Sequence, residues 1–66
     1  MEIPKFPIAI EMDGIVFTAM GLRKVSGRRW IAQAYTIHPV LGRQEVVSPS
    51  VLYRLAEQIL NGATSN

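Results

Sequence analysis

The side chains of this sequence that could support acid–base, metal or nucleophilic chemistry are few and lie far apart. The chain has one histidine, His38, and no cysteine, so thiolate ligation of zinc or of an iron–sulfur cluster is excluded. His38 precedes Pro39, where a turn histidine is the ordinary interpretation and a general base or metal ligand is the alternative. The five acidic residues are scattered, and no glycine-rich phosphate loop is present. We therefore predict a non-enzymatic protein without catalytic residues, cofactor or metal.

Binding chemistry is indicated instead by a cluster of basic residues. Between Gly14 and Gln44 the sequence holds no acid, and most of its basic residues bracket Ser26-Gly27. Cations beside an aromatic ring suit a phosphate backbone, and they suit an acidic protein surface equally well. The plain alternative is a solvated hairpin end whose arginines keep a strand edge soluble. The predicted contact residues for a partner protein or nucleic acid are Arg23, Lys24, Arg28, Arg29, Trp30 and Arg43.

The elements that position this cluster are predicted from apolar periodicity and turn residues. Alternating apolar residues favour strands, here over residues 6–12, 15–25 and 28–38, with a short fourth strand over 44–47. Residue pairs that tolerate positive φ favour tight turns, and the expected turns are Asp13-Gly14, Ser26-Gly27 and Leu41-Gly42-Arg43.

A C-terminal helix completes the predicted fold. Ser48 is suited to the N-cap, Pro49 to the first helical position and Gly62 to the position after the helix end. The helix is amphipathic, with an apolar face of Val51, Leu52, Leu55, Ala56, Ile59 and Leu60. The predicted fold is α+β, an antiparallel three- to four-stranded meander with one helix on one face, β-β-β-(β)-α. We expect a single domain over residues 1–61 and a flexible polar tail over 62–66.

Two-residue turns at Asp13-Gly14 and Ser26-Gly27 predict the register. They place Ile10 opposite Phe17, Ala19 opposite Ala34, and Arg23 opposite Trp30. The small residues of this face, Ala19, Gly21, Ala32 and Ala34, would let the helix approach closely. The other face is also mostly apolar, which a monomer rarely tolerates, and we predict a homodimer through Val16, Met20, Leu22, Ile31, Tyr35 and Ile37.

Length and composition support self-association. The chain has 66 residues, of which 48% are hydrophobic and 18% charged, with a net charge of +2 at pH 7. A domain of this size without disulfides is marginally stable alone. Residues 1–5 lack the pattern of a signal peptide, and no apolar run reaches the ~20 residues of a membrane helix. A cytosolic protein is therefore expected.

Part of the sequence resembles a known class of DNA-binding domain. The similarity rests on two segments followed by a short strand and a helix, Gly21-Leu22-Arg23-Lys24 and Gly27-Arg28-Arg29-Trp30-Ile31-Ala32-Gln33. These segments are similar to the sheet-plus-helix domains of integrase amino termini and plant ethylene-response factors. The resemblance implies major-groove binding by a three-stranded sheet. The chain departs from it because the face opposite the helix carries the apolar residues Met20, Leu22, Ile31 and Ile37.

Two functions follow as expectations. The first is a regulatory or interaction protein, a homodimer and a phage or mobile-element accessory protein, that binds a host or partner protein through the basic cluster or through the helix edge at Tyr53 and Arg54. The second is a small DNA-binding transcriptional regulator that uses the hairpin end from Arg23 to Arg29.

Overall fold

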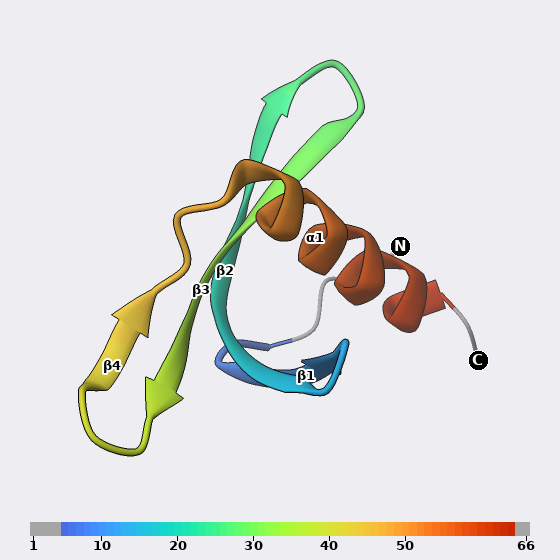
Figure 1. Ribbon diagram of the computed structural model, residues 1–66. Helices are drawn as coiled ribbons and strands as arrows, with labels where there is room; N and C mark the ends of the chain where they lie inside the picture. Colours follow the sequence, from blue (N-terminus) through green and yellow to red (C-terminus); the bar gives the residue numbers. More distant parts are fainter. Residues whose placement is uncertain (1–4, 65–66) are drawn as a thin grey trace.

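The computed structural model describes residues 5–64 and contains one antiparallel sheet followed by one helix (Figure 1). The four strands follow one another in the order β1-β2-β3-β4. This architecture confirms the predicted α+β meander with its fourth strand. The elements are β1 (Ile8–Met12), β2 (Ile15–Ser26), β3 (Arg29–His38), β4 (Gly42–Glu45) and α1 (Pro49–Thr64).

The first hairpin has the predicted turn and register. Asp13 and Gly14 form its two-residue loop with φ values of 56° and 78°, the positive values that such a loop requires. The pairing places Ile10 opposite Phe17, as predicted. Every apolar residue of this hairpin that was expected toward the helix therefore lies on that face.

The second hairpin differs from the prediction because β2 contains two extra residues. Ala19 lies opposite Ala34 as expected, but the register then shifts by one residue at Met20 and by one more at Val25. Each shift is a β-bulge, in which two residues oppose one on the neighbouring strand. The turn accordingly lies at residues 27–28 and not at Ser26-Gly27.

The bulge at Met20 exchanges the two faces of β2 beyond it. Leu22 pairs with Ala32 on the helix side, and Arg23 pairs with Ile31 on the opposite side. The predicted pairing of Arg23 with Trp30 is wrong, as is the placement of Leu22 on the face away from the helix. The half-buried Leu22 side chain packs against the core instead.

The turn between β3 and β4 is fixed by a histidine. Residues 39–41 form it, and β4 begins at Gly42, whose φ is 79°. The Nδ1 atom of His38 accepts hydrogen bonds from the backbone N–H groups of Val40 and Leu41, both at 3.0 Å. β4 pairs with β3 inside the same sheet, two residues earlier in sequence than the predicted 44–47.

The helix begins where its capping residues predict and ends later than expected. The N–H of Leu52 donates to the carbonyl of Ser48 at 3.1 Å, and Pro49 occupies the first helical position. The helix continues through Gly62 to Thr64, so the predicted tail begins too early. Residues 1–4 of the predicted domain and 65–66 of the predicted tail lie outside the described residues. Within residues 5–64, no helix is long and apolar enough to cross a membrane.

The hydrophobic core lies between α1 and the concave face of the sheet. β2 bends strongly, so that β1 and the first half of β2 curl beneath α1 while the β3–β4 hairpin extends away on the other side (Figure 1). Ala19, Ala32 and Ala34 face α1, as predicted, and allow its close approach. Gly21 was predicted to share this face opposite Ala32, but the bulge pairs it with Gln33 and places it on the other face. The buried residues are Met12, Phe17, Ala19, Ala32, Ala34, Leu55, Ala56 and Ile59.

Candidate functional site: the basic hairpin end

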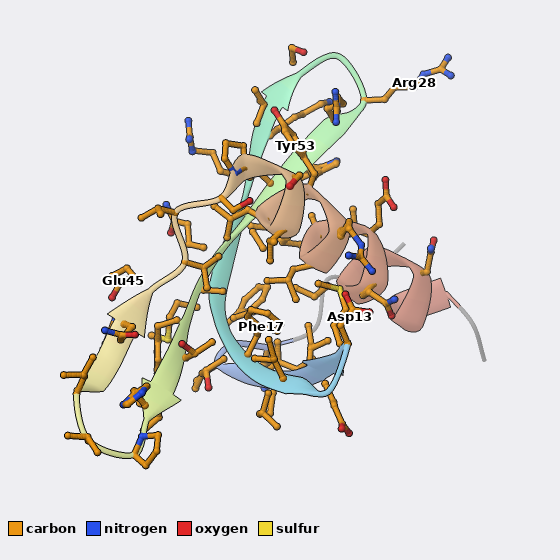
Figure 2. The ribbon with its side chains drawn as sticks, viewed as in Figure 1. Asp13, Phe17, Arg28, Glu45 and Tyr53 are labelled. Carbon is orange, nitrogen blue, oxygen red and sulfur yellow. The ribbon has the colours of Figure 1, made fainter. Side chains whose placement is uncertain are left out.

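Four of the predicted contact residues meet at the distal end of the β2–β3 hairpin. We call Arg23, Lys24, Arg28 and Arg29 the basic tip; all four are exposed. The two strands carry the tip beyond the first turn of α1, and Arg28 points away from the body of the protein (Figure 2). The bulges at Met20 and Val25 determine which of these side chains leave the sheet on each side.

Aromatic rings support two of the tip cations. The guanidinium carbon of Arg29 lies 3.9 Å from the ring centroid of Tyr53 in α1, and Lys24 Nζ lies 6.0 Å from the ring centroid of Trp30. Both distances are in the range of a cation–π attraction. The Arg29–Tyr53 stack joins two surfaces that the sequence suggested separately, the basic residues and the helix edge at Tyr53. Periodicity alone could not locate this contact, because it depends on where α1 crosses β3.

A small hollow lies between the tip and the helix. Its volume is about 100 Å³, which is smaller than most ligand pockets. The Glu57 carboxylate shares the lining of this hollow with the two arginines. The lining residues are Arg28, Arg29, Trp30, Tyr53, Ala56, Glu57 and Leu60.

The tip cations have no acidic partner in the part of the chain that the structure describes. The ion pairs within the described residues join Arg54 to Asp13 at 3.0 Å and Arg43 to Glu45 at 2.7 Å, and neither pair involves a tip residue. Over residues 5–64 the tip cations are therefore exposed without an ion pair of their own, although Glu57 lines the hollow beside Arg28 and Arg29.

Arg43 lies on a different strand from the tip residues. It is in β4, which pairs with the far end of β3. Its guanidinium carbon lies 4.0 Å from the centroid of the Tyr35 ring, while its Nε donates to Glu45 Oε2. The structure thus assigns Arg43 to a second, smaller cluster with Tyr35 and Glu45, and Arg23 of the tip lines the same groove as Arg43.

The potentially reactive side chains make structural contacts. The Nδ1 of His38 is occupied by the two turn amides described above, and the Ser48 and Ser50 hydroxyl oxygens lie 3.1 Å apart at the start of α1. Asp13 and Glu45 are held in ion pairs. In residues 5–64, no three histidine or acidic side chains gather into a set that could hold a metal ion.

The convex face of the sheet carries the predicted dimer residues other than Leu22. Val16, Met20 and Ile37 expose 58%, 44% and 64% of their surfaces, while Ile31 and Tyr35 are partly buried. Arg43 covers the Tyr35 ring, so charge interrupts the apolar surface that the sequence suggested. Beside this face is a groove of about 300 Å³ lined by Met20, Arg23, Ile31, Ala32, Gln33, Ala34, Arg43, Glu45, Val46 and Leu52.

Comparison of this chain with known protein families, with curated proteins and with solved structures found no match. The interpretation of the basic tip therefore depends on its own geometry and charge.

Proposed function

We propose that this protein is a small non-enzymatic binding protein that acts as a homodimer and presents its basic tip to an acidic surface of a partner protein. The observation that carries the proposal is the concentration of four exposed cations at a hairpin end where no described acid pairs with them. Charges placed in this way accelerate encounter with an oppositely charged surface and select against basic partners.

The packing of the tip supports a binding role over simple solubility. The Arg29 guanidinium lies over the Tyr53 ring, and Trp30 packs against the core at the base of the tip. Ordering side chains before binding lowers the entropy lost on complex formation. A hairpin end whose arginines served only to keep an edge soluble would not need these aromatic supports.

Exposed apolar side chains support the homodimer. Val40 and Val47 are each 83% exposed, and Leu41 and Ile37 are 66% and 64% exposed. Large apolar residues exposed at both ends of β4 in so small a domain favour association, because burial of each side chain is worth about 1.5–3 kcal/mol.

The experiment that tests the tip uses poly-L-glutamate as a defined acidic probe. The Arg28→Glu variant should bind it more weakly than the parent protein, because it removes a cation and adds an anion at the tip. Arg54→Glu makes the same change in net charge on the other side of α1, where Arg54 contacts Asp13, and should retain more of the binding. Equal losses in the two variants would mean that binding follows net charge and not the tip.

DNA binding is the second candidate, and the shape of the tip favours it. A two-stranded antiparallel ribbon is narrow enough to enter the major groove, and the four tip cations could contact phosphates. Titration of a 20-base-pair duplex at several salt concentrations would measure the number of such contacts. Replacing Arg28 with Gln should reduce the salt slope by about one unit if it contacts a phosphate. Tighter binding to poly-L-glutamate than to the duplex at equal salt would argue against this candidate.

A further inference from the structure

The outer edge of β4 is open, and the register shows which of its backbone groups face outward. β4 is the last strand of the sheet. The N–H of Val46 donates to the carbonyl of Ala34 at 3.0 Å, which directs the backbone of Val46 toward β3. Backbone direction alternates along a strand, so Gln44 also faces β3, while Arg43 and Glu45 direct their N–H and C=O groups to the open edge.

The sequence about this edge is self-complementary around Gln44. One residue before Gln44 is Arg43 and one residue after it is Glu45; three residues before it is Leu41 and three residues after it is Val47. A two-fold axis at Gln44 would therefore place each arginine opposite a glutamate and each leucine opposite a valine. The same axis makes the interface isologous, as in most homodimers.

We propose that a second copy of this chain pairs antiparallel with the open edge of β4, with the two-fold axis at Gln44. This inference rests on the proposed homodimer and names its surface, which is the edge of the sheet and not its convex face. The two four-stranded sheets join into one. Arg43 and the partner's Glu45 exchange both of their backbone hydrogen bonds, and the symmetric pair does the same.

The side chains at this edge are already arranged for such a contact. Arg43 and Glu45 keep 53% and 61% of their side-chain surface exposed although they pair with each other at 2.7 Å. The stack on Tyr35 fixes the Arg43 guanidinium at 4.0 Å from the ring centroid. Joining the edges brings a second Arg43 and Glu45 into line, so that each charge gains a partner of opposite sign across the strands.

The apolar residues that flank the charges complete the interface. Leu41 is 66% exposed and Val47 is 83% exposed in a single chain. The pairing places Leu41 beside the partner's Val47, and Val47 beside the partner's Leu41. A strand from another protein would pair equally well only if it carried a base, a spacer and an acid in the same order between two apolar residues. Charge complementarity therefore favours a second copy of this chain as the partner. The paired segment is short, so we expect a dimer that dissociates on dilution.

The decisive experiment mixes two charge variants. Arg43→Glu places acids opposite acids in its own dimer, and Glu45→Arg places bases opposite bases. Each variant alone should dissociate at least ~10-fold more readily than the parent protein. In an equimolar mixture, the acids of one chain meet the bases of the other, and the dimer should return. Sedimentation velocity at several concentrations measures all three samples against the 7.3 kDa chain mass.

Variants on α1 control for net charge. Arg54→Glu and Glu57→Arg change the net charge by the same amounts as the edge variants, at exposed positions on the helix. Each should remain as dimeric as the parent protein when examined alone. A loss of dimer in these variants equal to that in the edge variants would overturn the proposal, because it would show general charge repulsion.

A cysteine at the axis gives a second, independent readout. Gln44 would face the partner's Gln44 as a non-hydrogen-bonded pair with a Cα separation of about 4.5 Å, within the range that a disulfide spans. The chain has no native cysteine, so Gln44→Cys should form a disulfide-linked dimer on mild oxidation. Gln58→Cys, at an exposed position on α1, should not. Equal cross-linking of both variants would contradict the proposed axis.

The outcomes separate this inference from the proposed function. If the parent protein stays at the monomer mass at every concentration, both the homodimer and its edge interface are wrong. If the edge variants keep the parent mass while Met20→Asp or Ile31→Asp abolishes the dimer, the convex face forms the interface and the edge proposal is overturned. Dimer recovery only in the mixture supports the edge.

Discussion

Replacement of Leu55 with Ala should bring the protein close to the limit of its stability. Leu55 is the largest side chain that is fully buried, with 0% of its surface exposed. It lies at the centre of α1 in the same core cluster as Ala19 and Ala32. The alanines of this cluster have no side-chain torsions that could swing into the space left behind, so only its larger members, Met12, Phe17 and Ile59, could fill part of the cavity.

The expected loss follows from this arrangement. Leu→Ala substitutions in cores cost about 2–5 kcal/mol, with larger values where the site cannot collapse, and we expect about 3–5 kcal/mol here. The free energy of unfolding for 66 residues is about 3–10 kcal/mol at 0.05–0.15 kcal/mol per residue. A parent protein at the low end of this range would leave the variant largely unfolded, and one at the high end would leave it about half of its stability and a correspondingly lower urea midpoint.

Urea unfolding followed by far-UV circular dichroism tests this prediction. Leu41→Ala is the matched control, because the same atoms are removed from a side chain that is 66% exposed. In dilute solution, where dimer contacts are absent, the control should change stability by less than about 0.5 kcal/mol. A loss below about 1 kcal/mol for Leu55→Ala, or equal losses in both variants, would show that α1 does not pack on the sheet as described.

Three further predictions concern the turn, the bulge and the tip. His38→Ala removes the acceptor of two turn amides and should destabilise the β3–β4 turn by about 1–2 kcal/mol, seen as faster hydrogen exchange of those amides while β1 and β2 stay protected. Leu22→Asp should destabilise the fold by more than about 2 kcal/mol, whereas Arg23→Asp should stay within about 0.5 kcal/mol; urea midpoints in the reverse order would mean that the bulge at the preceding residues is absent. Tyr53→Ala removes the ring under Arg29 and should cost about 0.5–1 kcal/mol beyond the lost packing, which a double-mutant cycle with Arg29→Ala measures; additive losses would show that the stack contributes nothing.

The turn and register of the first hairpin could be predicted because its turn residues specify one geometry, although β1 begins at Ile8 and not at Phe6. Asp13 and Gly14 both adopt positive φ, and a two-residue loop then fixes every pair of β1 and β2. The helix start is equally local, since Ser48 and Pro49 act within one turn of chain. These features needed no knowledge of the rest of the fold.

The second hairpin could not be predicted from its turn residues alone, because a bulge needs no special residue type. The shift lies between Ala19 and Gly21, and a glycine inside a strand is one residue that can mark a bulge. The next residues carried a second signal. A regular strand would direct Arg23 toward the helix and Leu22 toward solvent, and the polarity of these two side chains favours the opposite arrangement.

The composition of the site was easier to predict than its extent. The four tip residues lie near one another in sequence and meet at one hairpin end. Arg43 was grouped with them by charge alone, although it pairs with Ile37 near the end of β3 that is far from the turn of the tip. Tyr53 could be assigned to the tip only after the crossing of α1 over β3 was known.

The bulge at Met20 also determines how far the basic tip can reach. Beyond this residue the alternation of β2 starts afresh, and Leu22, Trp30 and the buried Ala32 still belong to the core or pack against it. Lengthening both strands by two residues beyond Lys24 and Trp30 would carry the cations of the turn, Arg28 and Arg29, about 7 Å further from the body at ~3.4 Å per residue, without reversing the face of any side chain. A one-residue insertion would instead exchange the two faces of the tip. The distance spanned by this hairpin can therefore change in steps of residue pairs while the core stays the same.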